Sequence, residues 1–187
     1  MPALETLQNT RTTFNHVLRV IVRTTLATSG PNTAAAFTAA ARKRLVQTNV
    51  KSIQSSAVLF DTVEDGLSIP SESLETALRR SRSLYGAGMG IASLGVLMDV
   101  IKTTIGLRWA RDGLMADSLA AVDADISQAI QSAKEELAGG RPSDIDKART
   151  VVRELGEWLT ESSKDTERWG GEFPFEKALV SVEYWKL

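Results

Sequence analysis

The sequence contains no cysteine and a single histidine among its 187 residues. Without cysteine there is no disulfide framework, no thiolate-bound zinc or iron–sulfur cluster and no thiol nucleophile. Because His16 is the only imidazole, sites that need two histidines are excluded as well. A chain of this length buries roughly 70% of its unfolded surface, so it needs neither disulfides nor a structural metal in order to fold.

Sequence motifs for catalysis are also missing. There is no phosphate-binding Walker loop, no Gly-x-Ser-x-Gly elbow and no His-Glu-x-x-His pair. The glycines at positions 86, 88 and 90 fall short of a dinucleotide loop, because the third comes one position early and no strand precedes them. We therefore expect no enzyme activity, no catalytic or metal-binding residue, no cofactor and no small-molecule substrate.

The N-terminal region does not read as a secretion signal. Charged and polar residues interrupt its apolar residues throughout positions 1–29, and Pro2 replaces the glycine that myristoylation needs. We expect cytoplasmic synthesis without a signal peptide. The sequence leaves the final location of the protein open, and one option is that it becomes part of a larger particle.

Helical periodicity dominates the chain. Segments expected to be helical cover about residues 2–28, 32–64, 71–85, 91–109, 112–138 and 143–169, and glycine or proline lies at most of the breaks. The sequence predicts an all-α fold, a bundle of about five helices around a central apolar helix. Residues 1–171 are expected to form the bundle domain. Residues 172–187 are expected to form a short, extended C-terminal tail that packs on the bundle or on a neighbouring subunit, although the pattern at 178–185 also permits a helical turn.

Charge is distributed unevenly, although the formal net charge is only −1. Residues 1–60 carry +6, residues 61–78 carry −5, residues 79–111 carry +5 and residues 112–187 carry −7. This layout favours contacts between complementary protein surfaces, within one molecule or between copies. The basic residues predicted to make such contacts are Arg11, Arg19, Arg23, Arg42, Lys43 and Arg44. Nucleic acid or another polyanion is an alternative partner for them.

An apolar stretch lies at residues 84–107, of which residues 84–98 carry no charge. A bilayer span needs about 20 largely apolar residues, so we expect a buried central helix here. Flanking arginines leave insertion into an anionic membrane as an alternative. Small residues and one charged pair share a stripe that predicts close packing with another helix, or a membrane-inserting segment: Gly88, Ala92, Gly95, Asp99 and Lys102.

Large aromatic residues gather towards the C-terminus and predict interface anchors: Trp169, Phe173, Phe175, Tyr184 and Trp185. Together with the charge layout they favour a non-enzymatic assembly protein, such as a subunit of a shell, capsid, scaffold or filament. Its expected partner is itself, in a homo-oligomer. The two alternatives are a membrane-active protein that inserts residues 84–107 and a polyanion-binding protein that uses the basic N-terminal half.

Overall fold

The computed structural model describes residues 16–48, 58–139 and 145–185. The chain divides into two compact units, unit 1 at Met1–Arg44 and unit 2 at Leu45–Leu187. The boundary expected between residues 171 and 172 lies inside unit 2.

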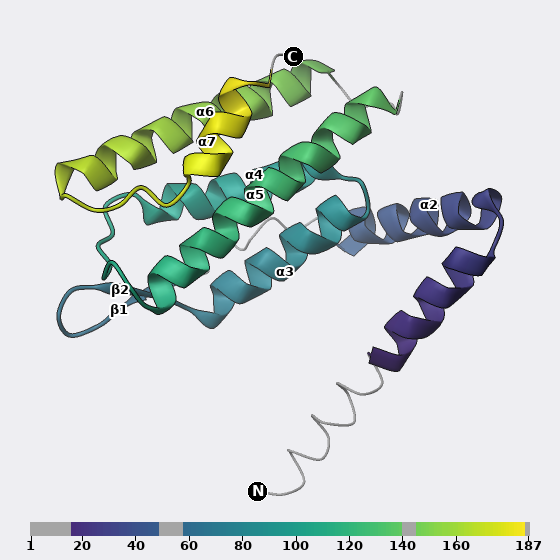
Figure 1. The fold of residues 1–187 in the computed structure, drawn as a ribbon, viewed down its shortest axis with the longest axis horizontal. Helices are drawn as coiled ribbons and strands as arrows, with labels where there is room; N and C mark the ends of the chain where they lie inside the picture. Colours follow the sequence, from purple (N-terminus) through teal and green to yellow (C-terminus); the bar gives the residue numbers. More distant parts are fainter. Residues whose placement is uncertain (1–15, 49–57, 140–144, 186–187) are drawn as a thin grey trace, which may run out of the picture. The chain divides into compact units, whose positions relative to one another are not determined.

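Unit 1 contains a helix at residues 16–28 and most of helix α2 (Pro31–Thr48) (Figure 1). The break between them falls at Ser29 and Gly30, as the glycine–proline sequence predicts. Pro31 occupies the first position of α2, where its missing N–H and fixed φ angle suit a helix start. The predicted helix to residue 64 is wrong at its end, since residues 58–64 are not helical. Its part at residues 49–57 lies outside the described residues.

After the last residues of α2, the next described element of unit 2 is a two-stranded hairpin. Strand β1 (Phe60–Thr62) pairs antiparallel with β2 (Ser68–Pro70), and Asp61 lies opposite Ile69. The turn between the strands contains Asp65 and Gly66, whose φ of 80° favours glycine. The Asp65 side chain accepts the Leu67 N–H at 3.0 Å, and such an Asp-Gly pair is a strong hairpin signal.

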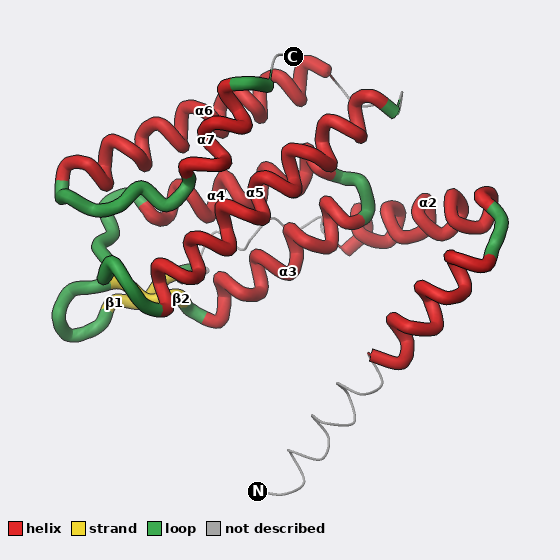
Figure 2. Tube along the Cα trace, viewed as in Figure 1, coloured by secondary structure: helices red, strands yellow, loops and turns green. Residues whose placement is uncertain are grey.

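Five helices follow: α3 (Glu72–Gly86), α4 (Gly90–Thr104), α5 (Leu114–Ala138), α6 (Ile145–Arg168) and α7 (Glu176–Glu183). Ser71 caps α3, because its Oγ accepts the Ser73 N–H at 3.1 Å. Helix α4 packs against α3, α5 and α6 and is the central apolar helix that the sequence predicts. Figure 2 shows how helix dominates the fold, so the predicted all-α bundle is confirmed.

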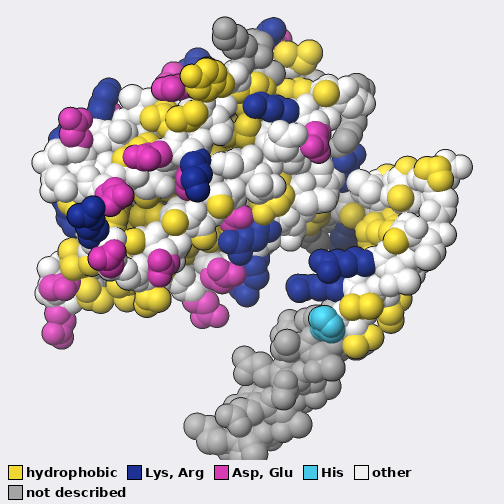
Figure 3. All heavy atoms as spheres, in the orientation of Figure 1, with side chains coloured by type: hydrophobic (Ala, Val, Ile, Leu, Met, Phe, Trp, Pro, Cys, Tyr) yellow, Lys and Arg dark blue, Asp and Glu magenta, His cyan; other side chains and the backbone are white. Residues whose placement is uncertain are grey.

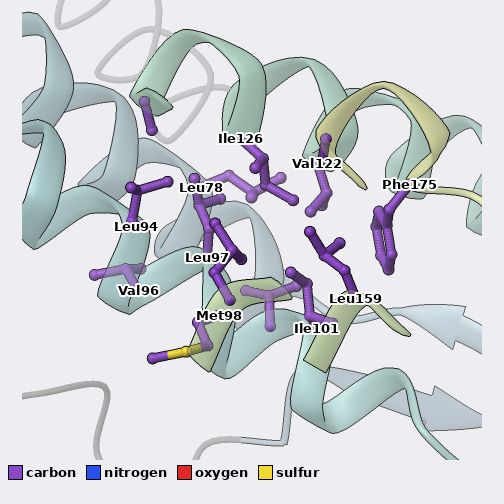
Figure 4. Packing of buried hydrophobic residues seen from close by; sticks show 14 of the residues in the cluster. Leu78, Leu94, Val96, Leu97, Met98, Ile101, Val122, Ile126, Leu159 and Phe175 are labelled. Carbon is purple, nitrogen blue, oxygen red and sulfur yellow. The ribbon is translucent and has the colours of Figure 1, made fainter. Parts of the chain in front are cut away.

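The core of unit 2 is built on α4. Leu94, Leu97, Val100 and Ile101 are fully buried there. Figure 4 shows Leu94, Leu97 and Ile101 among apolar side chains from neighbouring elements of the fold. The same core includes Leu119, Val122, Ile126, Leu155, Leu159 and Phe175. Every fully buried large side chain in the described residues belongs to unit 2.

The apolar stretch at 84–107 is not one continuous helix. Residues 87–89 form a turn between α3 and α4, and Gly88 adopts a φ of 70°. Gly90 then starts α4 directly against the α5 backbone. A Cβ at this position would collide with the backbone of Ala133, so only glycine permits the approach of the two helices.

The C-terminal segment is not an extended tail. Residues 176–183 form helix α7, which packs on α5 and α6. Phe175 anchors its start in the core, fully buried. Asp123 of α5 accepts the N–H of Ala178 at 2.8 Å and satisfies a donor in the first turn of α7. The side chain that caps this helix lies 55 residues earlier in the chain, so the local sequence pattern at 178–185 does not reveal the helix.

Candidate functional site

The buried ionisable groups of unit 2 hold its helices together. Arg82 of α3 contacts Oδ2 of Asp125 on α5 through Nε at 2.9 Å and through Nη2 at 2.8 Å. The Tyr85 hydroxyl donates a hydrogen bond to Oδ1 of Asp125 at 3.0 Å. The hydrogen bond and charge of Asp125 raise the pKa of Arg82. Burial, followed by the charge of Asp125, raises the pKa of Tyr85. The cluster joins α3 to α5.

Asp165 and Asp123 have similar roles. Asp165 of α6 accepts the Gly106 N–H at 2.9 Å, just after α4, and faces Arg108 at 3.5 Å. Burial raises the pKa of Asp123, which is bonded to the start of α7. Each buried carboxylate is thus engaged with backbone or arginine donors. In the described ranges no group of three His, Cys, Asp or Glu side chains could hold a metal ion.

Helix α4 carries most of the stripe of small residues. Gly88 lies in the preceding turn, Ala92 and Asp99 are exposed, and Gly95 and Lys102 are half-buried. A Cβ at Gly95 would meet nothing within 4 Å. Lys102 pairs with Asp99 at 3.7 Å, as predicted, and its Nζ lies 5.2 Å from the centroid of the Trp158 ring. Among the described helices, none is long and apolar enough to cross a bilayer.

The described part of unit 1 combines exposed cations with exposed apolar side chains. Its basic residues are Arg19, Arg23, Arg42, Lys43 and Arg44, and residues 16–44, here the basic arm, contain no carboxylate. Arg42 is half-buried and the other four are exposed, while Arg11 lies outside the described residues. The large apolar residues between them are 46–55% exposed: Val17, Leu18, Val20, Ile21 and Phe37. Figure 3 shows these two kinds of side chain mingled on unit 1.

The hairpin region of unit 2 has the opposite character. Residues 61–78 contain five acidic residues and no basic one: Asp61, Glu64, Asp65, Glu72 and Glu75, all of them exposed. Val63 and Ile69 are exposed apolar residues of the same segment, and Val58 is an exposed apolar residue just before it. These eight residues are called the acidic surface below. Acidic and hydrophobic side chains lie together over the hairpin and the start of α3 in Figure 3.

A pocket of about 680 Å³ lies in unit 2 where α5 begins and α6 ends. Trp109 and Trp169 line it and contact each other edge to face, with ring centroids 5.0 Å apart. Arg111 and Glu172 at its mouth form an ion pair of 3.4 Å. Since both charges are strongly exposed, this pair adds little stability.

The predicted aromatic anchors lie in different surroundings. Phe175 and Trp185 are buried in the core of unit 2, and Trp169 and Phe173 are half-buried beside the pocket. Tyr184, at 79% exposure, is the one that faces solvent. Most of this aromatic surface is therefore already covered within the described part of the chain.

The sequence patterns did not single out the acidic surface as a contact site. The five acidic residues stand out in the sequence as a charge run, and Asp61, Glu64 and Asp65 also resemble a solvated helix end. Val58 and Val63 fall in the helix expected at 32–64, and Ile69 falls in the break after it. The Asp-Gly pair at 65–66, flanked by Phe60, Val63 and Ile69, was the available signal.

No family model, curated protein or solved structure matches this chain. The basic arm and the acidic surface are therefore the features of the molecule that bear on its function.

Proposed function

We propose that the protein is a non-enzymatic assembly protein whose basic arm docks on unit 2 of a second copy. The observation that carries this proposal is the chemistry of the basic arm. Its described residues expose apolar side chains beside the exposed cations Arg19, Arg23 and Lys43, and residues 16–44 contain no carboxylate.

The division of charge between the units supports attraction between copies. Unit 1 has six basic residues and one acidic residue, a net charge of +5. Unit 2 has sixteen basic and twenty-two acidic residues, a net charge of −6. Two basic arms repel each other, whereas an arm and unit 2 attract. This asymmetry favours a head-to-tail contact, which generates rings or filaments.

The exposed apolar side chains supply the short-range part of the contact. Single exposed apolar residues are ordinary on protein surfaces, but Val17, Leu18, Val20 and Ile21 are consecutive or nearly so on one helix. Covering them stabilises a complex by about 25 cal/mol for each Å² of apolar surface removed from water. The cations add long-range attraction, which salt screens.

Two other uses of the chain are less well supported by the geometry. Inserting residues 84–107 into a membrane would dismantle the core, since the apolar residues of α4 are its centre. Nucleic-acid binding uses cations beside stacking aromatic residues, and among the described residues of the arm the aromatic rings are those of His16 and Phe37, with no tyrosine or tryptophan. Binding to a lipid surface and binding to a nucleic acid are therefore the alternative results that the experiment must distinguish from self-association.

Sedimentation velocity of the purified protein at about 50 mM and about 500 mM salt tests the proposal. We expect concentration-dependent association that weakens at high salt. The double substitution Arg19→Glu with Arg23→Glu should give a monomer, because it places acidic side chains on the arm. Lys164→Glu, an exposed charge reversal on α6, is the control and should assemble like the unchanged protein.

A chain that stays monomeric at low salt and high concentration would overturn the proposal. A monomer that binds vesicles with anionic lipid, or duplex DNA, would replace self-association with the corresponding alternative. Circular dichroism of each variant checks that the helices are intact.

A further inference from the structure

We infer that the acidic surface at the β1–β2 hairpin is the place on unit 2 where the basic arm of a second copy docks. This inference rests on the proposed function and adds the location of the receptor. The surface comprises Asp61, Glu64, Asp65, Glu72 and Glu75 with Val58, Val63 and Ile69.

The hairpin presents acidic and apolar side chains side by side. Asp61 and Ile69 are directly opposed across the strand pair, and both are exposed. Phe60 and Ser68, their neighbours along the two strands, are buried. Because side chains alternate between the faces of a strand, the outer face of the hairpin carries the carboxylate and the isoleucine next to each other.

The backbone of this surface is tied firmly to the bundle. Ser68 N–H donates to the Arg108 carbonyl at 2.6 Å, and Ser71 N–H donates to the Leu59 carbonyl at 3.0 Å. The Ser71 hydroxyl donates to the Val58 carbonyl at 2.7 Å. A surface held in one conformation loses little entropy when a partner binds.

The carboxylates of the surface are available to a partner. Glu75 faces Arg82 at 3.8 Å, but the strong contacts of Arg82 are with Asp125. Within the described parts of the chain, Asp61, Glu64, Asp65 and Glu72 form no ion pair. Asp65 is engaged through one oxygen with the Leu67 N–H, which leaves its charge uncompensated.

A second copy is the partner whose chemistry matches this surface. The basic arm offers cations and apolar side chains and lacks carboxylates, while the acidic surface offers carboxylates and apolar side chains and lacks cations. The Trp109–Trp169 pocket is a poorer match, because its lining mixes Arg111 with Asp112 and Glu172, and Arg111 already pairs with Glu172 at 3.4 Å. Electrostatic complementarity of this kind fixes the choice of partner and the register of docking.

A pair of charge-reversed proteins tests the location. The first is the arm variant, Arg19→Glu with Arg23→Glu, and the second is the surface variant, Glu64→Lys with Asp65→Lys. The control, Glu167→Lys with Glu183→Lys, changes the net charge of unit 2 by the same amount at exposed positions on α6 and α7. Association of each protein and of a 1:1 mixture is measured by sedimentation at low salt, after circular dichroism has confirmed folding.

The surface variant alone should associate at least about tenfold more weakly than the unchanged protein, and the control within about twofold of it. Mixing the arm variant with the surface variant should restore association, because each chain then meets an oppositely charged site on the other. If the surface variant assembles normally while the arm variant does not, the location is wrong and the proposed function stands. A mixture that stays monomeric contradicts both the location and the proposed function, because it still contains an unchanged arm and an unchanged acidic surface. A monomeric unchanged protein overturns both.

Discussion

At the scale of single residues, two glycines of the same helix, α4, should respond differently to substitution by alanine. Gly90 touches the backbone of Ala133, whereas a Cβ at Gly95 would find open space. We predict that Gly90→Ala lowers the free energy of unfolding by about 1–3 kcal/mol, because the helices must separate to admit the methyl group. Gly95→Ala should raise it by about 0.5–1 kcal/mol, because glycine weakens a helix interior.

Urea denaturation followed by circular dichroism measures both changes, and Gly95→Ala is the matched control in the same helix. A Gly90→Ala protein as stable as the unchanged one would show that α4 and α5 do not approach as described. In the sequence both glycines lie in the apolar stretch at 84–107, and the sequence does not show which of them tolerates a larger side chain. The ranking depends on Ala133, which is distant in sequence and lies close only in the folded bundle.

At the scale of elements, helix α7 shows where local sequence patterns stop being sufficient. The amphipathic helices of the bundle were predictable because their apolar spacing is local, as at Met115, Leu119 and Val122 of α5. The segment at 176–183 is short and rich in β-branched residues, so its own pattern fits a strand as well as a helix. Its conformation is decided by tertiary contacts from Phe175 and Asp123.

The contact of Asp123 with α7 makes a prediction about stability and pH. Asp123→Ala should lower the free energy of unfolding by about 1–3 kcal/mol, because the buried Ala178 N–H loses its acceptor. Amide exchange at Ala178 should accelerate in the same variant. Asp123→Asn keeps an acceptor oxygen and should lose less.

The pH dependence has a definite sign. Burial raises the pKa of Asp123, so the folded protein binds this proton more tightly than the unfolded chain does. Titration of Asp123 therefore favours the fold below its unfolded pKa and opposes it as pH rises through the native pKa. Relative to Asp123→Asn, the unchanged protein should gain stability as pH falls through the native pKa of Asp123 towards its unfolded pKa. A difference between the two proteins that is constant with pH, measured by urea denaturation, would contradict the burial of this carboxylate.

At the scale of the whole molecule, a net charge of −1 is the sum of a basic unit 1 and an acidic unit 2. The segment charges were readable from sequence, but the separation into a basic unit and an acidic unit required the contact pattern of the fold. The acidic surface was predictable only in part. Its carboxylates form a visible run, whereas pairing of β1 with β2 is what brings Asp61 beside Ile69 on the outer face.

The separation of the units predicts that residues 45–187 fold without unit 1. Every buried hydrophobic residue of the described core lies between Leu59 and Trp185, so removing residues 1–44 takes away none of them. The fragment should unfold cooperatively with a free energy within about 1 kcal/mol of that of the full chain. The comparison belongs at high salt and low concentration, where self-association does not stabilise the full chain.

The same fragment should also be monomeric at low salt, because it retains the acidic surface but has lost the arm that binds it. Added in excess to the full chain, it should cap growing assemblies and shorten them, since it offers a receptor and no arm. Sedimentation of the mixture measures that shift. A fragment that assembles by itself as the full chain does would place the self-association contacts wholly within unit 2, and the basic arm would then have another partner.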